Sequence, residues 1–283
     1  MYAQAYFDYD SKKSGGVTVS HLRFGDTPIR STYLIDQADF ISCSQQSYVD
    51  RYDILAGSKP GAVFLLNTIW NREELEQNLP AAMKRYMAEN KIEFYTIDAV
   101  DIARRLGLGN RTNMIMQAAF FKLAKILPLE DAVKYLKASV AQTYGKKGDD
   151  VVAMNCAAID EGVSSIVRIE IPAAWGVLED EPEIEAGNEP DYIKNFLVPV
   201  NRMEGDLIPV SRMAAMEDGS YPPGTAAYEK RGIAIRVPHW KADSCIQCNQ
   251  CSYVCPHGCI RPVLVTDEEI KEAPDGFETR PAK

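Results

Sequence analysis

Five of the seven cysteines in this 283-residue chain fall in one short segment, from Cys245 to Cys259. The other two, Cys43 and Cys156, lie far from that segment and from each other. A secreted disulfide framework spreads paired cysteines along a short chain, whereas free thiols gathered in one place are typical of metal ligation in a reducing compartment. The clustering therefore predicts a metal-binding segment in a cytoplasmic protein.

The spacing of four of these cysteines indicates which metal group they bind. Gaps of two, two and three residues separate Cys245, Cys248, Cys251 and Cys255, and Pro256 follows at once. This run is typical of bacterial ferredoxins, in which the first three cysteines bind one 4Fe-4S cluster and the fourth binds another. A tight loop of this kind directs three thiolates inward and leaves backbone amides to hydrogen-bond the cluster sulfides. We therefore predict all four as ligands, with Cys255 serving a second cluster.

Zinc is the alternative metal, because zinc knuckles also use pairs of cysteines two residues apart. Those pairs are usually separated by a longer loop and do not form a series of three that ends in Cys-Pro. A zinc-stabilised interaction module would also be colourless. Cys43 and Cys156 are predicted to be packing residues, since a lone cysteine most often behaves as a small buried hydrophobe. Cys259 could be a spare ligand, but many ferredoxin repeats have a small residue at its place, so it too is predicted to be a packing residue.

The overall composition excludes several classes of protein. The chain carries 31 Lys and Arg against 40 Asp and Glu, a net charge of -9, and it has no basic block, so nucleic acid is not an expected partner. Its longest apolar run, Ala62 to Leu66, is far too short to cross a membrane. With 46% hydrophobic residues, the chain has the composition of an ordinary globular protein.

Strand and helix patterns alternate through the first part of the chain. Short β-branched, aromatic or apolar runs predict strands at Val17–Phe24, Asp39–Cys43, Ala62–Thr68, Ile92–Ile97 and Ser165–Ile171. Helical spacing predicts helices at Arg72–Glu89 with Asn71 as N-cap, from Asp98 onward, and at Thr112–Ile126, Leu129–Tyr144 and Asp149–Asp160. This alternation predicts an α/β fold with a Rossmann-like, largely parallel sheet and helices on both faces.

The composition changes after this region and predicts three domains. Residues 1–178 form the α/β domain. An acidic stretch that begins at Glu179 and is interrupted by Pro and Gly predicts a surface linker. It leads into a small irregular domain, and residues 179–237 together form the second predicted domain. Residues 238–283 then form a partial ferredoxin-like iron–sulfur domain, the first half of one that would need a second cysteine run.

Three further segments, taken with the cysteine run, resemble the pyruvate:ferredoxin (flavodoxin) oxidoreductase family. They are YDSKKSGGVTVSHLRFG at Tyr9–Gly25, GNRTNMIMQAAFFKLAKILP at Gly109–Pro128 and PPGTAAYEKRGIA at Pro222–Ala234. The resemblance covers essentially the whole chain in the family's order: the gamma-type domain, the small domain named for Glu229, Lys230 and Arg231, and the ferredoxin-type domain.

The resemblance implies an activity for the complete enzyme. The family decarboxylates pyruvate oxidatively on thiamine diphosphate and Mg²⁺, passes electrons through 4Fe-4S clusters to ferredoxin or flavodoxin, and transfers the acetyl group to coenzyme A. We find no thiamine diphosphate motif in these residues, and the gamma-type domain begins downstream of the family's Gly-rich coenzyme A loop. The isolated chain is therefore predicted to be an inactive segment of the enzyme, which would work with its remaining domains or chains as a homodimer.

The resemblance also suggests where part of a coenzyme A site persists. Adjacent lysines in a Gly-rich turn, and polar residues at a helix start, suit a phosphate group. The candidate residues are Lys12, Lys13, Ser14, Gly15 and Gly16 in the turn, and Asn110, Arg111 and Asn113 at the helix start. The alternative function is a stand-alone iron–sulfur adaptor that transfers electrons and docks another protein through its α/β domain.

Overall fold

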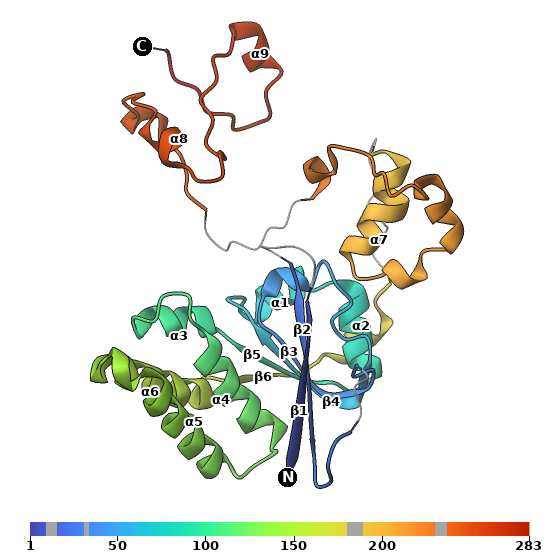
Figure 1. The fold of residues 1–283 in the computed structure, drawn as a ribbon, viewed down its shortest axis with the longest axis vertical. Helices are drawn as coiled ribbons and strands as arrows, with labels where there is room; N and C mark the ends of the chain where they lie inside the picture. Colours follow the sequence, from blue (N-terminus) through green and yellow to red (C-terminus); the bar gives the residue numbers. More distant parts are fainter. Residues whose placement is uncertain (10–15, 31–33, 180–188, 230–236, 283) are drawn as a thin grey trace. The chain divides into compact units, whose positions relative to one another are not determined.

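The structure of the chain is a computed structural model that describes residues 1–9, 16–30, 34–179, 189–229 and 237–282 (Figure 1). It divides into two compact units, Met1–Ile233 and Ala234–Lys283. The first unit contains the α/β domain and the second contains the ferredoxin-type cysteine run. Each unit is described by itself below.

A four-stranded sheet in the order β3-β4-β5-β6 forms the centre of the first unit. The strands are β3 (Ala38–Cys43), β4 (Ser58–Asn67), β5 (Glu93–Ile97) and β6 (Val167–Ile169). Neighbours β3, β4 and β5 are parallel, while β6 runs antiparallel to β5. The predicted largely parallel sheet is confirmed. The last predicted strand is correct in place but is only three residues long.

Two short helices cover one face of the sheet, α1 (Arg72–Asn78) and α2 (Ala81–Glu89). The prediction of a single helix over this stretch is wrong, because Leu79 is extended (φ -73°, ψ 133°) and ends α1. Pro80 explains the break, since a proline clashes with a helical conformation of the residue before it. Asn71 caps α1 as predicted, in a capping box with Glu74.

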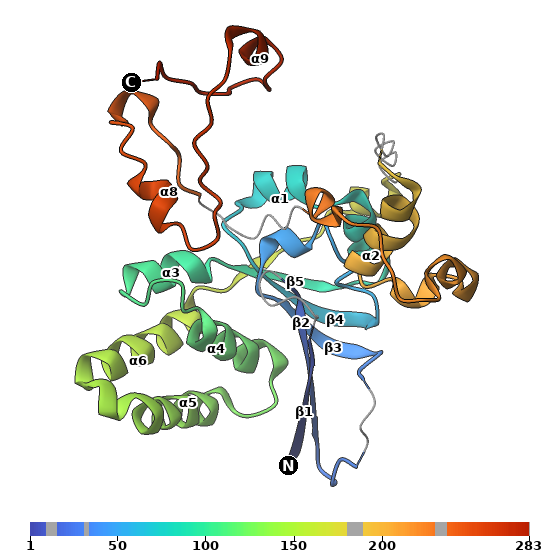
Figure 2. The same cartoon turned by 45° about the horizontal axis from the view of Figure 1, so that its top comes forward.

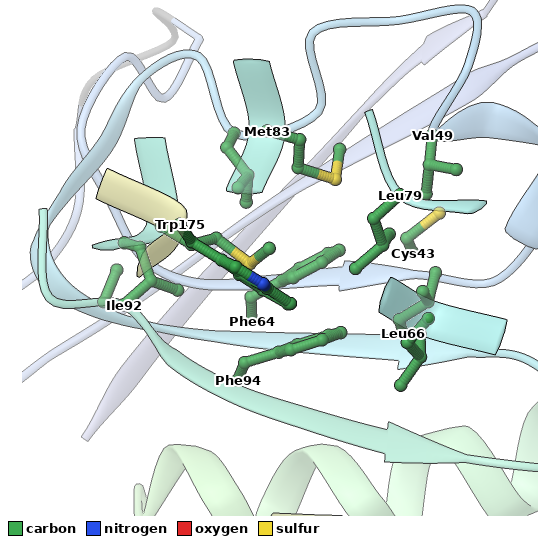
Figure 3. Packing of buried hydrophobic residues seen from close by; sticks show 13 residues of the cluster. Cys43, Val49, Phe64, Leu66, Leu79, Met83, Ile92, Phe94 and Trp175 are labelled. Carbon is green, nitrogen blue, oxygen red and sulfur yellow. The ribbon is translucent and has the colours of Figure 1, made fainter. Parts of the chain in front are cut away.

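The core on this face consists of large apolar side chains that are shielded from water (Figure 3). Phe64 of β4 and Phe94 of β5 stack with their ring centroids 5.3 Å apart. The 3₁₀ segment Ala173–Val177 closes the core with Trp175, which is 3% exposed. The indole Nε1 of Trp175 donates to both carboxylate oxygens of Glu76 at 2.8 and 2.9 Å, so its one polar group is satisfied.

Four helices lie on the opposite side of the sheet: α3 (Ala99–Arg105), α4 (Asn113–Ala124), α5 (Leu129–Tyr144) and α6 (Asp149–Ser164), of which α5 packs on α4 and α6. Apolar side chains of α3, α4 and α6 pack against Leu65 and Ile97 of the sheet. Both views show these helices on the other side of the sheet from α1 and α2 (Figures 1 and 2). The prediction of helices on both faces is therefore confirmed.

A separate antiparallel hairpin precedes the sheet, formed by β1 (Tyr2–Tyr9) and β2 (Thr18–Gly25). The predicted strand at Val17–Phe24 is confirmed, but it pairs with β1, which the sequence analysis did not anticipate. Phe24 at the end of β2 contacts Phe120 of α4 with ring centroids 6.1 Å apart. This contact joins the end of the hairpin to the α/β domain.

The described residues 189–229 contain only short elements, as predicted for the small irregular domain. They are a π-helical turn at Ile193–Leu197, α7 (Val198–Asn201) and 3₁₀ turns at Gly205–Leu207, Val210–Met216 and Thr225–Tyr228. Most of the predicted acidic linker, residues 180–188, lies outside the described residues.

The second unit contains a 3₁₀ turn at Ala242–Ser244 and two short helices, α8 (Gln250–Val254) and α9 (Asp267–Lys271). The remaining 3₁₀ turns, both in the first unit, are Gln46–Tyr48 and Gly145–Lys147. Within the part of the chain that the structure describes, no helix combines the length and the apolar character needed to cross a membrane.

Candidate metal centre

The predicted ligands lie on a loop and the short helix that follows it. Cys245 comes directly after the 3₁₀ turn, Cys251 lies in α8, and Cys255 caps the C-terminal end of α8. Between the first two of these, Gln247 (φ 61°) and Asn249 (φ 57°) adopt the left-handed conformation. Two left-handed residues so close together bend the backbone sharply, as a loop that wraps a compact group requires.

Backbone amides already point at two of the sulfurs. The amide of Gln247 donates to Cys245 Sγ at 3.4 Å, and the amide of Cys259 donates to Cys255 Sγ at 3.3 Å. Amide donors from Ile260, His257 and Cys259 lower the pKa of the Cys255 thiol to about 7. The thiolate is the form that binds iron, so this environment favours the ligand form of Cys255.

The four cysteine side chains are not gathered around a common point. Within the described ranges, no three His, Cys, Asp or Glu side chains lie close enough to hold a metal ion. Cys248 and Cys251 are exposed, and all seven cysteines of the chain are free thiols. The donor set fits an iron–sulfur cluster by its chemistry, its spacing and its amide–sulfur hydrogen bonds. The side chains must turn inward to bind one.

One feature of this unit was missed by sequence reasoning. The Arg280 side chain, from the last residues of the chain, hydrogen-bonds the backbone on either side of Ser244, including the carbonyl of Cys245. The two ends of this contact lie 35 residues apart in sequence, and nothing in the local pattern around Arg280 signals it. The first predicted ligand is thus held by a distant residue.

Three cysteines lie outside the run, and two of them, Cys43 and Cys156, have packing roles. The predicted packing role of Cys259 is wrong, because its side chain is exposed. Cys43, at the end of β3, is 4% exposed, its thiol donates to the Gln45 carbonyl at 3.0 Å, and burial raises its pKa to about 11. Cys156 of α6 packs beside the small apolar cluster formed by Ala118, Val140 and Ile159. Neither thiol is placed to ligate iron, in agreement with the sequence analysis.

Replacing these two cysteines is expected to leave iron binding intact. In anaerobically reconstituted protein, Cys43→Ala and Cys156→Ala should each show the same iron-to-protein ratio as the parent chain, measured by colorimetric iron assay. Far-UV circular dichroism confirms that each variant is folded. A folded variant that loses half or more of its iron would show that its cysteine is a ligand.

The coenzyme A candidates fall in two places in the first unit. Lys12, Lys13, Ser14 and Gly15 lie outside the described residues, while the Gly16 carbonyl accepts a hydrogen bond from Tyr48 Oη at 3.4 Å. The helix-start candidates are exposed: Asn110 and Arg111 precede α4, and Asn113 is its first residue.

The first turn of α4 is chemically suited to an anion. Thr112 caps this helix without a side-chain hydrogen bond to its amides, and no acidic residue lies in the first turn. The unpaired amides and the positive end of the helix dipole therefore face no negative side chain of the helix itself. This environment is compatible with a phosphate group.

Three known families match the chain in order, and together they place it among the iron–sulfur oxidoreductases. The family described as "Pyruvate ferredoxin/flavodoxin oxidoreductase" matches residues 1–165, the EKR domain of unknown function matches residues 179–234, and a 4Fe-4S binding domain matches residues 237–260. The chain belongs to the pyruvate ferredoxin/flavodoxin oxidoreductase family, as the three sequence motifs predicted.

Curated relatives match the whole chain at high identity. It is 60% identical over 282 residues to pyruvate-flavodoxin oxidoreductase from Enterobacter agglomerans. It is 53% identical over 282 residues to pyruvate:ferredoxin oxidoreductase from Moorella thermoacetica. Each match covers 100% of this chain and 24% of the relative, so the chain spans about a quarter of their length.

Among solved structures, the pyruvate oxidoreductase subunit PORC from Thermotoga maritima is similar to 60% of this chain and 82% of its own. The two share 17% sequence identity with a TM-score of 0.46.

Proposed function

We propose that this chain is the segment of a pyruvate:ferredoxin (flavodoxin) oxidoreductase that faces coenzyme A and transfers electrons. The complete enzyme would convert pyruvate, coenzyme A and oxidised acceptor to acetyl-CoA, CO₂ and reduced acceptor. The observation that carries this proposal is the ferredoxin-type cysteine run, embedded in a chain that aligns end to end with pyruvate oxidoreductases. The stand-alone adaptor has no comparable support.

The division of labour follows the three predicted domains, 1–178, 179–237 and 238–283. In the last of these, Cys245, Cys248 and Cys251 would hold one 4Fe-4S cluster and Cys255 would ligate a second. A bound cluster accepts and passes on single electrons. Amides that donate to Cys245 Sγ and Cys255 Sγ would stabilise the thiolates in this role.

The α/β domain would contribute part of the coenzyme A site. Lys12, Lys13 and the neighbouring Ser14, Gly15 and Gly16 would meet phosphate oxygens, together with the first turn of α4. Lysines act as point charges, and the uncapped start of α4 offers amide donors. Asn110, Arg111 and Asn113 would complete this helix start.

The remaining cofactors and the electron acceptor would come from outside this segment. Thiamine diphosphate and Mg²⁺ would bind in other domains or chains, and ferredoxin or flavodoxin would accept the electrons. The complete enzyme would be cytoplasmic, because free thiols that ligate iron need a reducing compartment. The family resemblance further implies that it would be a homodimer.

A chimaeric enzyme tests the proposed function. The 282-residue region of the Enterobacter agglomerans relative that matches this chain would be replaced by the chain itself. We expect pyruvate- and coenzyme A-dependent reduction of a viologen dye by the anaerobic chimaera, whereas the 283-residue chain alone should reduce none. A correctly folded, iron-containing chimaera with no such activity would contradict the proposed function.

The same chimaera tests the coenzyme A residues. Replacing both lysines (Lys12→Ala with Lys13→Ala) removes two point charges from the phosphate site. We expect KM for coenzyme A to rise about tenfold, equivalent to about 1.4 kcal/mol, with KM for pyruvate unchanged. A second pair of adjacent lysines, changed as Lys146→Ala with Lys147→Ala, is the control; both are exposed in the 3₁₀ turn after α5. Unchanged coenzyme A kinetics in the first variant would show that the site lies elsewhere.

A further inference from the structure

A residue near the C-terminal end of the second unit hydrogen-bonds the backbone that leads into the cysteine run. Arg280 Nη1 donates to the carbonyls of Ala242 at 2.7 Å and Asp243 at 3.0 Å, and also to the carbonyl of Cys245. The first two carbonyls belong to the 3₁₀ turn that precedes the loop. The Ala242 carbonyl also accepts the Cys245 amide at 3.1 Å, so Arg280 adds a cationic donor at the end of a turn where positive side chains are favourable.

Two more contacts join the same pair of segments. Gln247 Nε2 donates to the Pro281 carbonyl at 2.6 Å, and His239 Nε2 lies 3.2 Å from Glu278 Oε1. Residues 278–281 therefore contact the chain before, at and after Cys245. The arrangement is a clamp on the loop and not a single incidental hydrogen bond.

The clamp acts on the geometry of the first predicted ligand. With the Cys245 carbonyl held by Arg280 and the Gln247 side chain held by Pro281, the peptide groups between them have little freedom to rotate. One of these groups carries the Gln247 amide, which donates to Cys245 Sγ at 3.4 Å. Fixing this backbone therefore fixes the amide that supports the Cys245 thiolate.

The clamp also places a charge. An arginine guanidinium stays protonated under all ordinary conditions, and Arg280 contacts the backbone of the ligand residue itself. Since a reduced cluster carries one more negative charge than an oxidised one, a fixed cation nearby stabilises the reduced form more.

We propose that Arg280 is a positioning residue for the iron–sulfur cluster bound by Cys245, Cys248 and Cys251. Its guanidinium holds the backbone of the first ligand, which slows loss of iron, and its charge raises the reduction potential of that cluster. This inference rests on the proposed iron–sulfur role of the cysteine run, and it assigns the function of a residue outside the run.

Two variants of the full 283-residue chain, reconstituted anaerobically, separate the two effects. Arg280→Met keeps an unbranched stem but removes the hydrogen bonds and the charge. We expect iron to pass to a chelator about tenfold faster than in the parent, because hydrogen bonds from a charged donor are lost. A redox titration followed by electron paramagnetic resonance should show a more negative midpoint potential. Arg280→Lys keeps the charge and should restore most of the potential while retaining iron less well than the parent.

Two further variants keep the test decisive. Lys271→Ala removes a positive charge from the exposed end of α9 and should change neither property. Gln247→Asn shortens the side chain that reaches Pro281, at a left-handed position that asparagine tolerates, and should speed iron loss without moving the potential.

The outcomes distinguish the inference from the function on which it rests. A parent chain that binds no iron overturns the proposed function. A parent with a cluster, whose Arg280→Met variant keeps both the iron release rate and the potential, overturns the role of Arg280. Faster iron release with an unchanged potential in Arg280→Met also contradicts the proposal. That result would mean that Arg280 only holds residues 278–281 against the loop and that its charge does not act on the cluster.

Discussion

Replacing Cys251 by serine is expected to abolish stable binding of the first 4Fe-4S cluster by the protein. In the proposed assignment, Cys251 is the third of three thiolate ligands, and it lies at the start of α8. A serine hydroxyl remains protonated near neutral pH and is a poor ligand for iron in place of a thiolate. With only two cysteines of the loop left, the cluster should be lost during gel filtration, and iron and acid-labile sulfide measured per chain should fall to near background for this site.

Cys259→Ser is the matched control for this experiment. Cys259 lies in the same exposed segment, and its amide, which the substitution retains, donates to Cys255 Sγ. We expect its iron content to equal that of the parent chain. If Cys251→Ser kept the parent's iron and Cys259→Ser lost it, the ligand assignment would be wrong.

The substitution Gly162→Ala is expected to destabilise the α/β domain by about 2 kcal/mol, a net loss after a small gain in helix propensity. Gly162 lies where α6 packs closely on α4. A Cβ added there would lie 2.5 Å from the Ile115 carbonyl oxygen, 2.9 Å from Ile115 Cα and 3.1 Å from Ala118 Cβ. Two of these atoms are backbone, so the helices would have to move apart. Urea unfolding followed by far-UV circular dichroism measures the loss.

Gly145→Ala provides the comparison, because it makes the same change where space is open. Gly145 follows α5 with a helical φ of -53°, and a Cβ added there would have no neighbour within 4 Å. Its free energy of unfolding should stay within about 0.5 kcal/mol of the parent or rise slightly. Equal destabilisation by the two substitutions would show that the close helix contact does not limit stability.

Local patterns in the sequence predicted most of the α/β domain because its central strand β4 contains a continuous apolar run. Phe64, Leu65 and Leu66 are fully buried in β4, and such a run is hard to place anywhere but the centre of a sheet. The helix over residues 72–89 was predicted as one because its apolar spacing continues across Pro80. Pro80 indicates a break between two helices, but the helical spacing of apolar residues on both sides of it favoured one continuous helix.

Features that depend on tertiary contacts were not visible in the sequence. Strand β1 is exposed along most of its length, so no alternation of buried and exposed residues marked it. It is a strand because it pairs with β2. Similarly, the cysteine spacing predicted the candidate ligands from local chemistry alone, whereas the clamp of Arg280 on the ligand loop joins segments distant in sequence.

The metal content of the parent chain tests the central claim most directly. After anaerobic isolation and reconstitution with iron and sulfide, the 283-residue protein should be brown, with broad absorbance at about 400 nm. It should contain iron and acid-labile sulfide in equal amounts. Metal analysis of the same sample should find little zinc. Stoichiometric zinc with no iron in a colourless protein would contradict the account and favour a zinc-stabilised interaction module.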